Sequence, residues 1–128
     1  MTSAQYCQLM VERGRLVALF EGEVPVGYLT YLVCPTVEYT LSYYQRDLRL
    51  PPPLDYPDAS VIYIEQLESL RFSRELLRQI RSLLTARHPK WTKAVWYRLH
   101  GTRWHRYNLT EGGAFYVADV QRPCSVPA

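Results

Sequence analysis

The chain has 128 residues, of which 48% are apolar and 13% aromatic, and it carries a net charge of +3. This length suits one domain with one hydrophobic core, and the composition excludes an intrinsically disordered chain. No apolar run approaches the roughly 18 residues of a membrane-spanning helix, and the N-terminus lacks the features of a signal peptide, so we expect a cytoplasmic protein without a membrane partner.

Hydrophobic periodicity divides the first half of the chain into a helix, a hairpin and a second helix. In order, these are a helix from Thr2 or Ser3 to about Arg13, a strand over 15–20, a turn over 21–25, a strand over 26–33 and a helix over 36–48. Gly14 ends the first helix, and Gly22 can supply the positive φ of the hairpin turn. The continuous apolar character of both strands indicates a sheet that is covered on both faces.

The second half alternates strands with a helix. In order, we expect a Pro-rich loop over 51–58, a strand over 61–65, a helix over 74–87, a strand over 93–98, a strand over 114–120 and a loosely ordered tail over 121–128. Ser73 is a good N-cap for the strongest helix. Residues 102–109 fit either a short helix capped by Thr102 or the second arm of a hairpin that turns at His100 and Gly101. The prediction is one α/β (α+β) domain with a mixed central sheet flanked by helices.

Positive charge is concentrated in residues 71–106. This third of the chain holds eight Arg and two Lys against one acidic residue, whereas residues 1–70 hold four Arg against nine acidic residues. Such a segment suits an anionic partner: a phosphorylated cofactor, nucleic acid or an acidic protein surface. A solvated basic face that aids solubility is the alternative.

Cysteine and histidine usage argues against disulfides and metal. Cys7, Cys34 and Cys124 are widely separated and odd in number, which favours reduced thiols in a reducing compartment. No CxxC pair is present, and the three histidines are not spaced with the cysteines to complete a zinc site. We therefore expect no metal.

The order of elements over residues 15–120 resembles the GNAT superfamily of acyl-CoA-dependent N-acyltransferases. The likeness is carried by the hairpin with its Val26-Gly27-Tyr28 step, by the strand 62–65 with the helix that follows it, and by the closing segments 94–97, 102–107 and 113–116. The resemblance implies a single GNAT-like domain over 1–128. It also implies transfer of an acyl group from a CoA or carrier-protein thioester to an amine.

The resemblance further implies a set of site residues. Glu65 matches an acid/base position on the family's central strand, and Tyr107 matches a tyrosine on a short last helix that protonates the departing thiolate. The family's pyrophosphate loop is rich in glycine, whereas the matching stretch here has none. Side chains and the N-terminus of the following helix would then bind the cofactor, with the candidates Leu67, Ser69, Arg71, Ser73 and Arg74.

Two GNAT-like groups also lack these glycines. Toxin-activating lysine acyltransferases take acyl groups from acyl carrier protein and use an N-terminal histidine, but no histidine precedes His88 here. Degenerate GNAT-like bacteriophage proteins need not be enzymes. The alternative function is therefore a non-catalytic protein of phage or mobile-element origin that binds protein or nucleic acid through its basic 71–106 surface. The candidate contacts on that surface are Arg78, Arg81, Arg98, Arg103 and His105.

Overall fold

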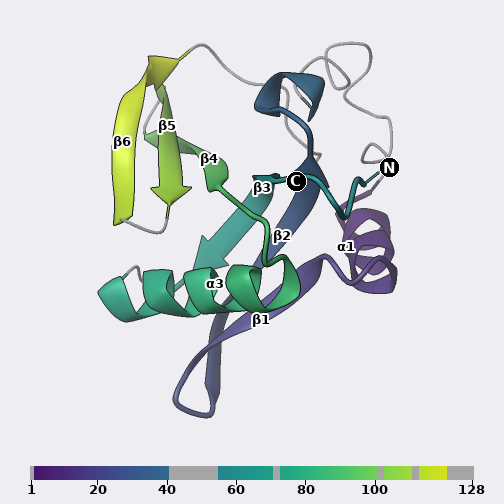
Figure 1. Cartoon of the computed structure of the whole chain (residues 1–128). Coiled ribbons are helices and arrows are strands. Elements are labelled where there is room, and N and C mark those ends of the chain that lie inside the picture. The colour runs from purple at the N-terminus through teal and green to yellow at the C-terminus, as the bar shows by residue number, and fades with distance from the viewer. Residues whose placement is uncertain (1, 41–54, 71–72, 101–102, 111–112, 121–128) are drawn as a thin grey trace.

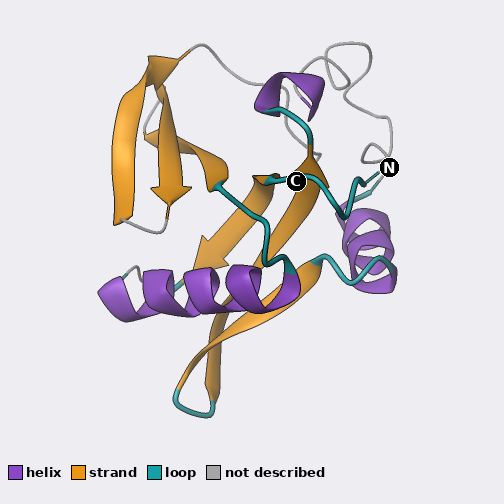
Figure 2. Ribbon diagram, in the orientation of Figure 1, coloured by secondary structure: helices purple, strands orange, loops and turns teal. Residues whose placement is uncertain are grey.

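A six-stranded mixed sheet with a helix on each face forms the fold of the computed structural model, which describes residues 2–40, 55–70, 73–100, 103–110 and 113–120 (Figures 1 and 2). Side chains at 99–100, 103–104 and 113–120 are not described. The elements are α1 (Ser3–Glu12), β1 (Leu16–Glu21), β2 (Val24–Cys34), β3 (Val61–Ser69), α3 (Arg74–Arg87), β4 (Lys93–His100), β5 (Arg103–Thr110) and β6 (Gly113–Val120).

The strands lie in the sheet in the order in which they occur in the chain. All neighbours are antiparallel except β3 and β4, which are parallel because the chain crosses over between them through α3. The sheet is therefore mixed, as the sequence predicts.

Helix α1 forms where its capping sequence predicts it. Thr2 and Gln5 make a capping box in which each side chain bonds the other residue's backbone N–H. Gly14 follows the helix with a φ of 70°, a conformation that favours glycine. Tyr6 and Met10 are fully buried and pack against Leu32 on one face of the sheet.

Helix α3 covers the opposite face. The Ser73 hydroxyl caps it by accepting the backbone N–H of Leu76, and Leu76, Ile80 and Leu84 form its buried stripe. The side chain of Gln79 donates to the carbonyl of Phe20 and accepts its N–H, so α3 is fastened to the outer strand β1. Because α1 and α3 lie on opposite faces, β2 is buried on both sides from Leu29 to Cys34, as its apolar sequence predicts.

Several boundaries differ from those expected. β3 and β4 run on to Ser69 and His100, because their polar ends keep pairing with β2 and β5. Residues 103–110 form a strand, so the short-helix alternative is wrong and the hairpin alternative is confirmed. Of the expected helix over 36–48, residues 37–40 are helical, residue 36 precedes the helix, and 41–48 lie outside the described residues. Half of the expected Pro-rich loop, residues 51–54, and the tail over 121–128 also lie outside them.

A polar network lies beneath the C-terminal end of α3. His88 is buried, and its Nε2 lies 2.9 Å from the hydroxyl of Tyr31. The Arg15 guanidinium stacks over the Tyr31 ring and donates from Nε to the Asp55 carboxylate at 2.8 Å. Burial lowers the pKa of His88, and the positive charge of Arg15 lowers it further.

The buried environment of His88 predicts that the folded protein loses stability in acid. Because the folded protein holds His88 neutral below its ordinary pKa of about 6.5, the unfolded chain binds the additional proton first. The free energy of unfolding should be constant above about pH 6.5 and fall below it, by up to about 1.4 kcal/mol per pH unit. Urea unfolding between pH 7.5 and 5 measures this slope. His88→Gln should flatten it. Equal slopes in wild type and His88→Gln would contradict the assignment.

Candidate functional site

The parallel strands β3 and β4 separate part-way along their length. Their register pairs Val61–Ile64 with Lys93–Trp96, and the described residues beyond share no further pair. β3 stays with β2 as far as Ser69, whereas β4 stays with β5 as far as His100. Figure 1 shows the end of β3 running toward the start of α3 while β4 turns away with β5. The sheet therefore opens between its two central strands.

A β-bulge lies at the same level on β3. Opposite β2, Tyr31 pairs with Ile64 and Thr30 pairs with Gln66, so Glu65 is an additional residue in the ladder. A bulge bends its strand and re-aims the side chains beside it. Since Glu65 directly follows the last residue paired with β4, the predicted catalytic carboxylate lies at the point where the sheet opens.

Glu65 lies on the face of the sheet that α1 covers. Burial raises the pKa of Tyr6, and the negative charge of the nearby Glu65 carboxylate raises it further. Tyr6 is fully buried, with its hydroxyl 2.7 Å from Oγ1 of Thr30. Thr30 pairs with Gln66, whose Oε1 is buried without a hydrogen-bond partner in the described part of the chain. We call Tyr6, Thr30, Glu65 and Gln66 the polar cluster.

Cys34 lies near this cluster but is not an activated nucleophile. Its thiol is free and buried. Burial raises its pKa to about 11; the neighbouring Thr40 hydroxyl lowers it, while the carboxylates of Asp55, Glu38 and Glu65 raise it. The thiol therefore stays protonated at neutral pH, and thiols in that form react slowly.

Tyr107 does not join Glu65. It lies on β5 rather than on a short helix, and it pairs with Trp96, with the two ring centroids 5.5 Å apart. Trp96 packs against the core beneath α3, so Tyr107 belongs to that face of the sheet. Glu65 belongs to the α1 face. Strand register therefore places the two predicted catalytic residues on opposite faces of the sheet and two strands apart.

The predicted cofactor-binding residues fall at the end of β3 and the start of α3. Leu67 is buried in the core beneath α3, and Ser69 is half-buried where β3 ends. The Ser73 hydroxyl is engaged as the helix cap, whereas Arg74 is exposed in the first turn of α3. Arg71 lies outside the described residues.

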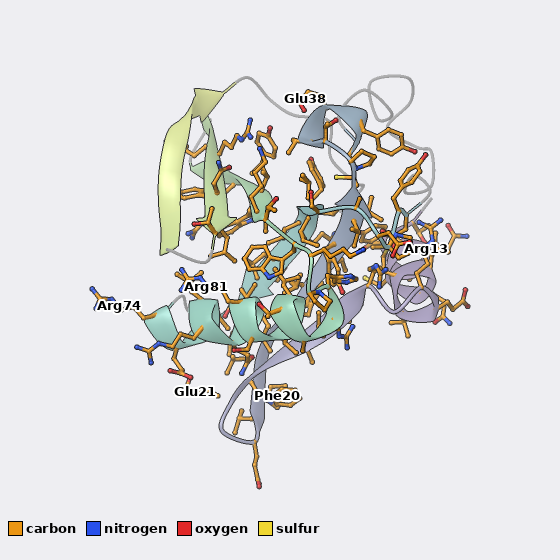
Figure 3. The ribbon with its side chains drawn as sticks, viewed as in Figure 1. Arg13, Phe20, Glu21, Glu38, Arg74 and Arg81 are labelled. Carbon is orange, nitrogen blue, oxygen red and sulfur yellow. The ribbon has the colours of Figure 1, made fainter. Side chains whose placement is uncertain are left out.

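Arginines line a hollow of about 300 Å³ along the N-terminal half of α3. Its lining residues are Arg74, Leu77, Arg78 and Arg81, and we call it the arginine groove. Figure 3 shows Arg74 at the amino end of α3 and Arg81 on the side of the helix nearer β5. Nε of Arg81 is buried with no hydrogen-bond partner among the described residues, while Arg78 bonds Glu75 at 3.1 Å. The groove is therefore basic and can accept an anion.

The remaining basic candidates lie on the β4–β5 hairpin. Arg98 pairs across the strands with His105, which brings both to the face of the hairpin that carries Trp96. The guanidinium of Arg98 stacks on the Trp96 ring at 5.6 Å. Arg103 begins β5, and its side chain is not among those described.

A second hollow, of about 450 Å³, lies between the β1–β2 hairpin and α3. Apolar side chains of Phe20, Val26 and Leu76 line it, and among the described residues of the predicted site only Ser73 contributes to it. It is therefore separate from the polar cluster, which occupies the other face of the sheet.

The sequence did not single out Tyr6, Thr30 or Gln66 as site residues. Tyr6 was assigned to the apolar face of the first helix, which is where it lies, but its hydroxyl reaches Thr30 on β2. A tyrosine at helical spacing looks the same whether its hydroxyl meets solvent or a buried polar group. No signal in the sequence could have found this contact.

Neither a metal site nor a membrane-spanning helix is found in the part of the chain that the structure describes. Among the described residues no group of three metal-ligating side chains comes together, and none of the described helices is both long and apolar enough to cross a bilayer. Comparisons of the chain with protein-family models, with curated proteins and with solved structures found no match.

Proposed function

We propose that this protein is a GNAT-like acyltransferase of the cytoplasm that moves an acyl group from a CoA or carrier-protein thioester to an amine. The observation that carries the proposal is the opening between β3 and β4, with the bulged Glu65 at its inner end. Facing strand edges offer backbone N–H and C=O groups to an extended ligand. The pantetheine arm of such a thioester is extended and contains amides, so it suits this opening.

The arginine groove supports a phosphorylated donor. β3 ends next to the start of α3, so the arginine groove lies toward the open end of the gap between β3 and β4 (Figure 3). Arg74, Arg78 and Arg81 can neutralise phosphates, and the N-terminus of α3 adds a partial positive charge. These side chains would replace the glycine-rich backbone that the GNAT family uses.

Glu65 supplies the chemistry in this proposal. The amine nitrogen attacks the thioester carbonyl, a C–N bond forms and the C–S bond breaks. Glu65 accepts the proton that the amine loses. A thiol has an ordinary pKa of about 8.5, so the departing thiolate can take its proton from water. Tyr107 is not needed for this step, since it lies on the other face of the sheet.

Calorimetry and turnover together test the proposal. Wild-type protein should bind acetyl-CoA, a longer acyl-CoA or an acylated carrier protein, and release thiol when an amine is present. Glu65→Gln should keep the binding and lose about a hundredfold or more in turnover, because it can no longer accept a proton. The double variant Arg78→Glu and Arg81→Glu should lose about tenfold or more in affinity, because two phosphate contacts are reversed.

The arginine groove also favours the second candidate function, a non-catalytic protein that binds an acidic protein or nucleic acid. This candidate differs in its prediction for Glu65: Glu65→Gln leaves partner binding intact, while the double arginine variant abolishes it. Absence of binding by every thioester at millimolar concentration would reject the acyltransferase and leave this candidate. Tyr107→Phe serves as the matched control, and it should behave as wild type in each assay.

A further inference from the structure

The β4–β5 hairpin carries aromatic and basic side chains on the sheet face against which α3 packs. Register pairs Trp96 with Tyr107 and Arg98 with His105, and the two pairs are two residues apart on each strand, so the four side chains share one face. The rings of Trp96 and Tyr107 have centroids 5.5 Å apart, and Cζ of Arg98 lies over the Trp96 ring, 5.6 Å from its centre. We call these four residues the hairpin surface.

The hairpin surface is anchored in the core and reaches solvent. Trp96 packs against the core beneath α3, and it is half-buried, as are His105 and Tyr107. Arg98 is exposed. Aromatic rings that a core holds on one side and solvent meets on the other form a firm platform on which a flat ligand can stack.

The arginine groove borders the hairpin surface. Leu77, which lines the groove, packs against the same core cluster as Trp96, and that cluster includes Leu109 of β5. Arg81 lies on the side of α3 nearer β5 (Figure 3). Arginines on α3 and aromatic rings on the hairpin are therefore neighbours on one face of the protein. Residues 71–106, which supply nearly all of these side chains, hold ten basic residues against one acidic residue.

We infer that this face binds single-stranded nucleic acid, with bases stacked on the hairpin surface and phosphates bound in the arginine groove. Bases stack on aromatic rings and on arginine side chains with little regard to sequence. Arg74, Arg78 and Arg81 extend over about 10 Å of helix at 1.5 Å per residue, which suits several phosphates in a row. An acidic protein would also be attracted to the arginines, but carboxylates do not stack on aromatic rings, so the hairpin surface favours nucleic acid.

Nucleic-acid binding at this face goes beyond the proposed acyl transfer and does not rest on it. Glu65 lies on the opposite face of the sheet and takes no part in stacking. The arginine groove would serve both ligands, so an oligonucleotide should compete with a phosphorylated thioester donor wherever both bind. Glu65→Gln should bind oligonucleotide as wild type does, whether or not the chain transfers acyl groups.

Fluorescence anisotropy with a labelled oligothymidine of about 12 nucleotides measures the binding, and an oligouridine compares RNA with DNA. Arg98→Ala should weaken the binding about tenfold at low salt and lower the slope of log Kd against log salt concentration by about 0.7. Lys90→Ala is the matched control, because it removes one positive charge from an exposed residue outside both surfaces, and its affinity should stay within about twofold of wild type.

Inorganic polyphosphate separates stacking from simple charge attraction. Trp96→Leu keeps an apolar side chain but removes the flat ring, so it should weaken oligothymidine about tenfold and leave polyphosphate unchanged. A duplex of the same length should bind more weakly than the single strand, because its bases are already stacked. Failure of wild type to bind oligothymidine at low salt overturns the inference. Equal effects of Arg98→Ala on oligothymidine and polyphosphate, with none from Trp96→Leu, also overturn it and leave a plain anion site that suits an acidic protein.

Discussion

Replacing Gly27 with alanine is expected to lower the free energy of unfolding by about 3 kcal/mol. A Cβ at this position would lie 2.1 Å from the carbonyl oxygen of Glu68 and 2.8 Å from Cα of Ser69. Both are backbone atoms of the paired strand β3, so no side-chain rotation can relieve the overlap. The N-terminal part of β2 must therefore move away from the C-terminal part of β3. This part of β3 borders the opening in the sheet.

Gly22→Ala provides the control for this prediction. Gly22 has a φ of 63°, and a Cβ there would meet nothing within 4 Å. Only backbone strain is added, and we expect a loss of about 1 kcal/mol. Urea unfolding followed by circular dichroism compares the two variants. If Gly27→Ala were no less stable than Gly22→Ala, the close approach of β2 and β3 would not exist in solution.

Asp55→Ala is expected to cost about 3 kcal/mol or more, because it breaks a largely buried ion pair. The side chains of Arg15 and Asp55 are 13% and 16% exposed. Without Asp55, the Arg15 charge stays partly buried beside Tyr31, and the backbone N–H of Val33 loses the carboxylate that accepts it at 2.6 Å. Both losses weaken the attachment of the chain before β3 to the C-terminal part of β2.

Thermal and urea unfolding at pH 7 measure this loss, with Asp58→Ala as the control. Asp58 is exposed, and its replacement should change the free energy of unfolding by less than about 0.5 kcal/mol. Asp55→Asn should fall between the two, because the amide oxygen can still accept from Val33 but carries no charge. Equal stability of Asp55→Ala and Asp58→Ala would show that the ion pair contributes nothing.

Local signals made most of the elements predictable. The caps at Thr2 and Ser73 and the turns at Gly14 and Gly22 depend on a few neighbouring residues, and each lies where expected. The ends of β3 and β4 were set too early because polar residues there do not resemble a buried strand. Residues 103–110 were left undecided between helix and strand. Pairing with β4 on one side and β6 on the other makes them a strand.

The candidate site was less predictable than the fold. Glu65 and Tyr107 were both identified through the resemblance to the GNAT family, and Glu65 lies where the sheet opens. The pairing of Tyr107 with Trp96 puts Tyr107 on the other face of the sheet. The face on which a strand residue lies depends on strand register, and a shift of one residue in register moves its side chain to the other face. Local patterns do not fix that register, so the sequence did not show that the two residues lie on opposite faces.

By itself, the sequence determined a single α/β domain, the helices with their caps, the basic 71–106 segment and the carboxylate at Glu65, because each depends on composition or on residues within a few positions of one another. Only the tertiary structure decided that β3 and β4 separate after Ile64, that Glu65 forms a bulge there, and that the Tyr6 hydroxyl reaches Thr30 on β2 from α1. These features depend on strand register and on contacts between residues far apart in the chain, which local patterns do not encode.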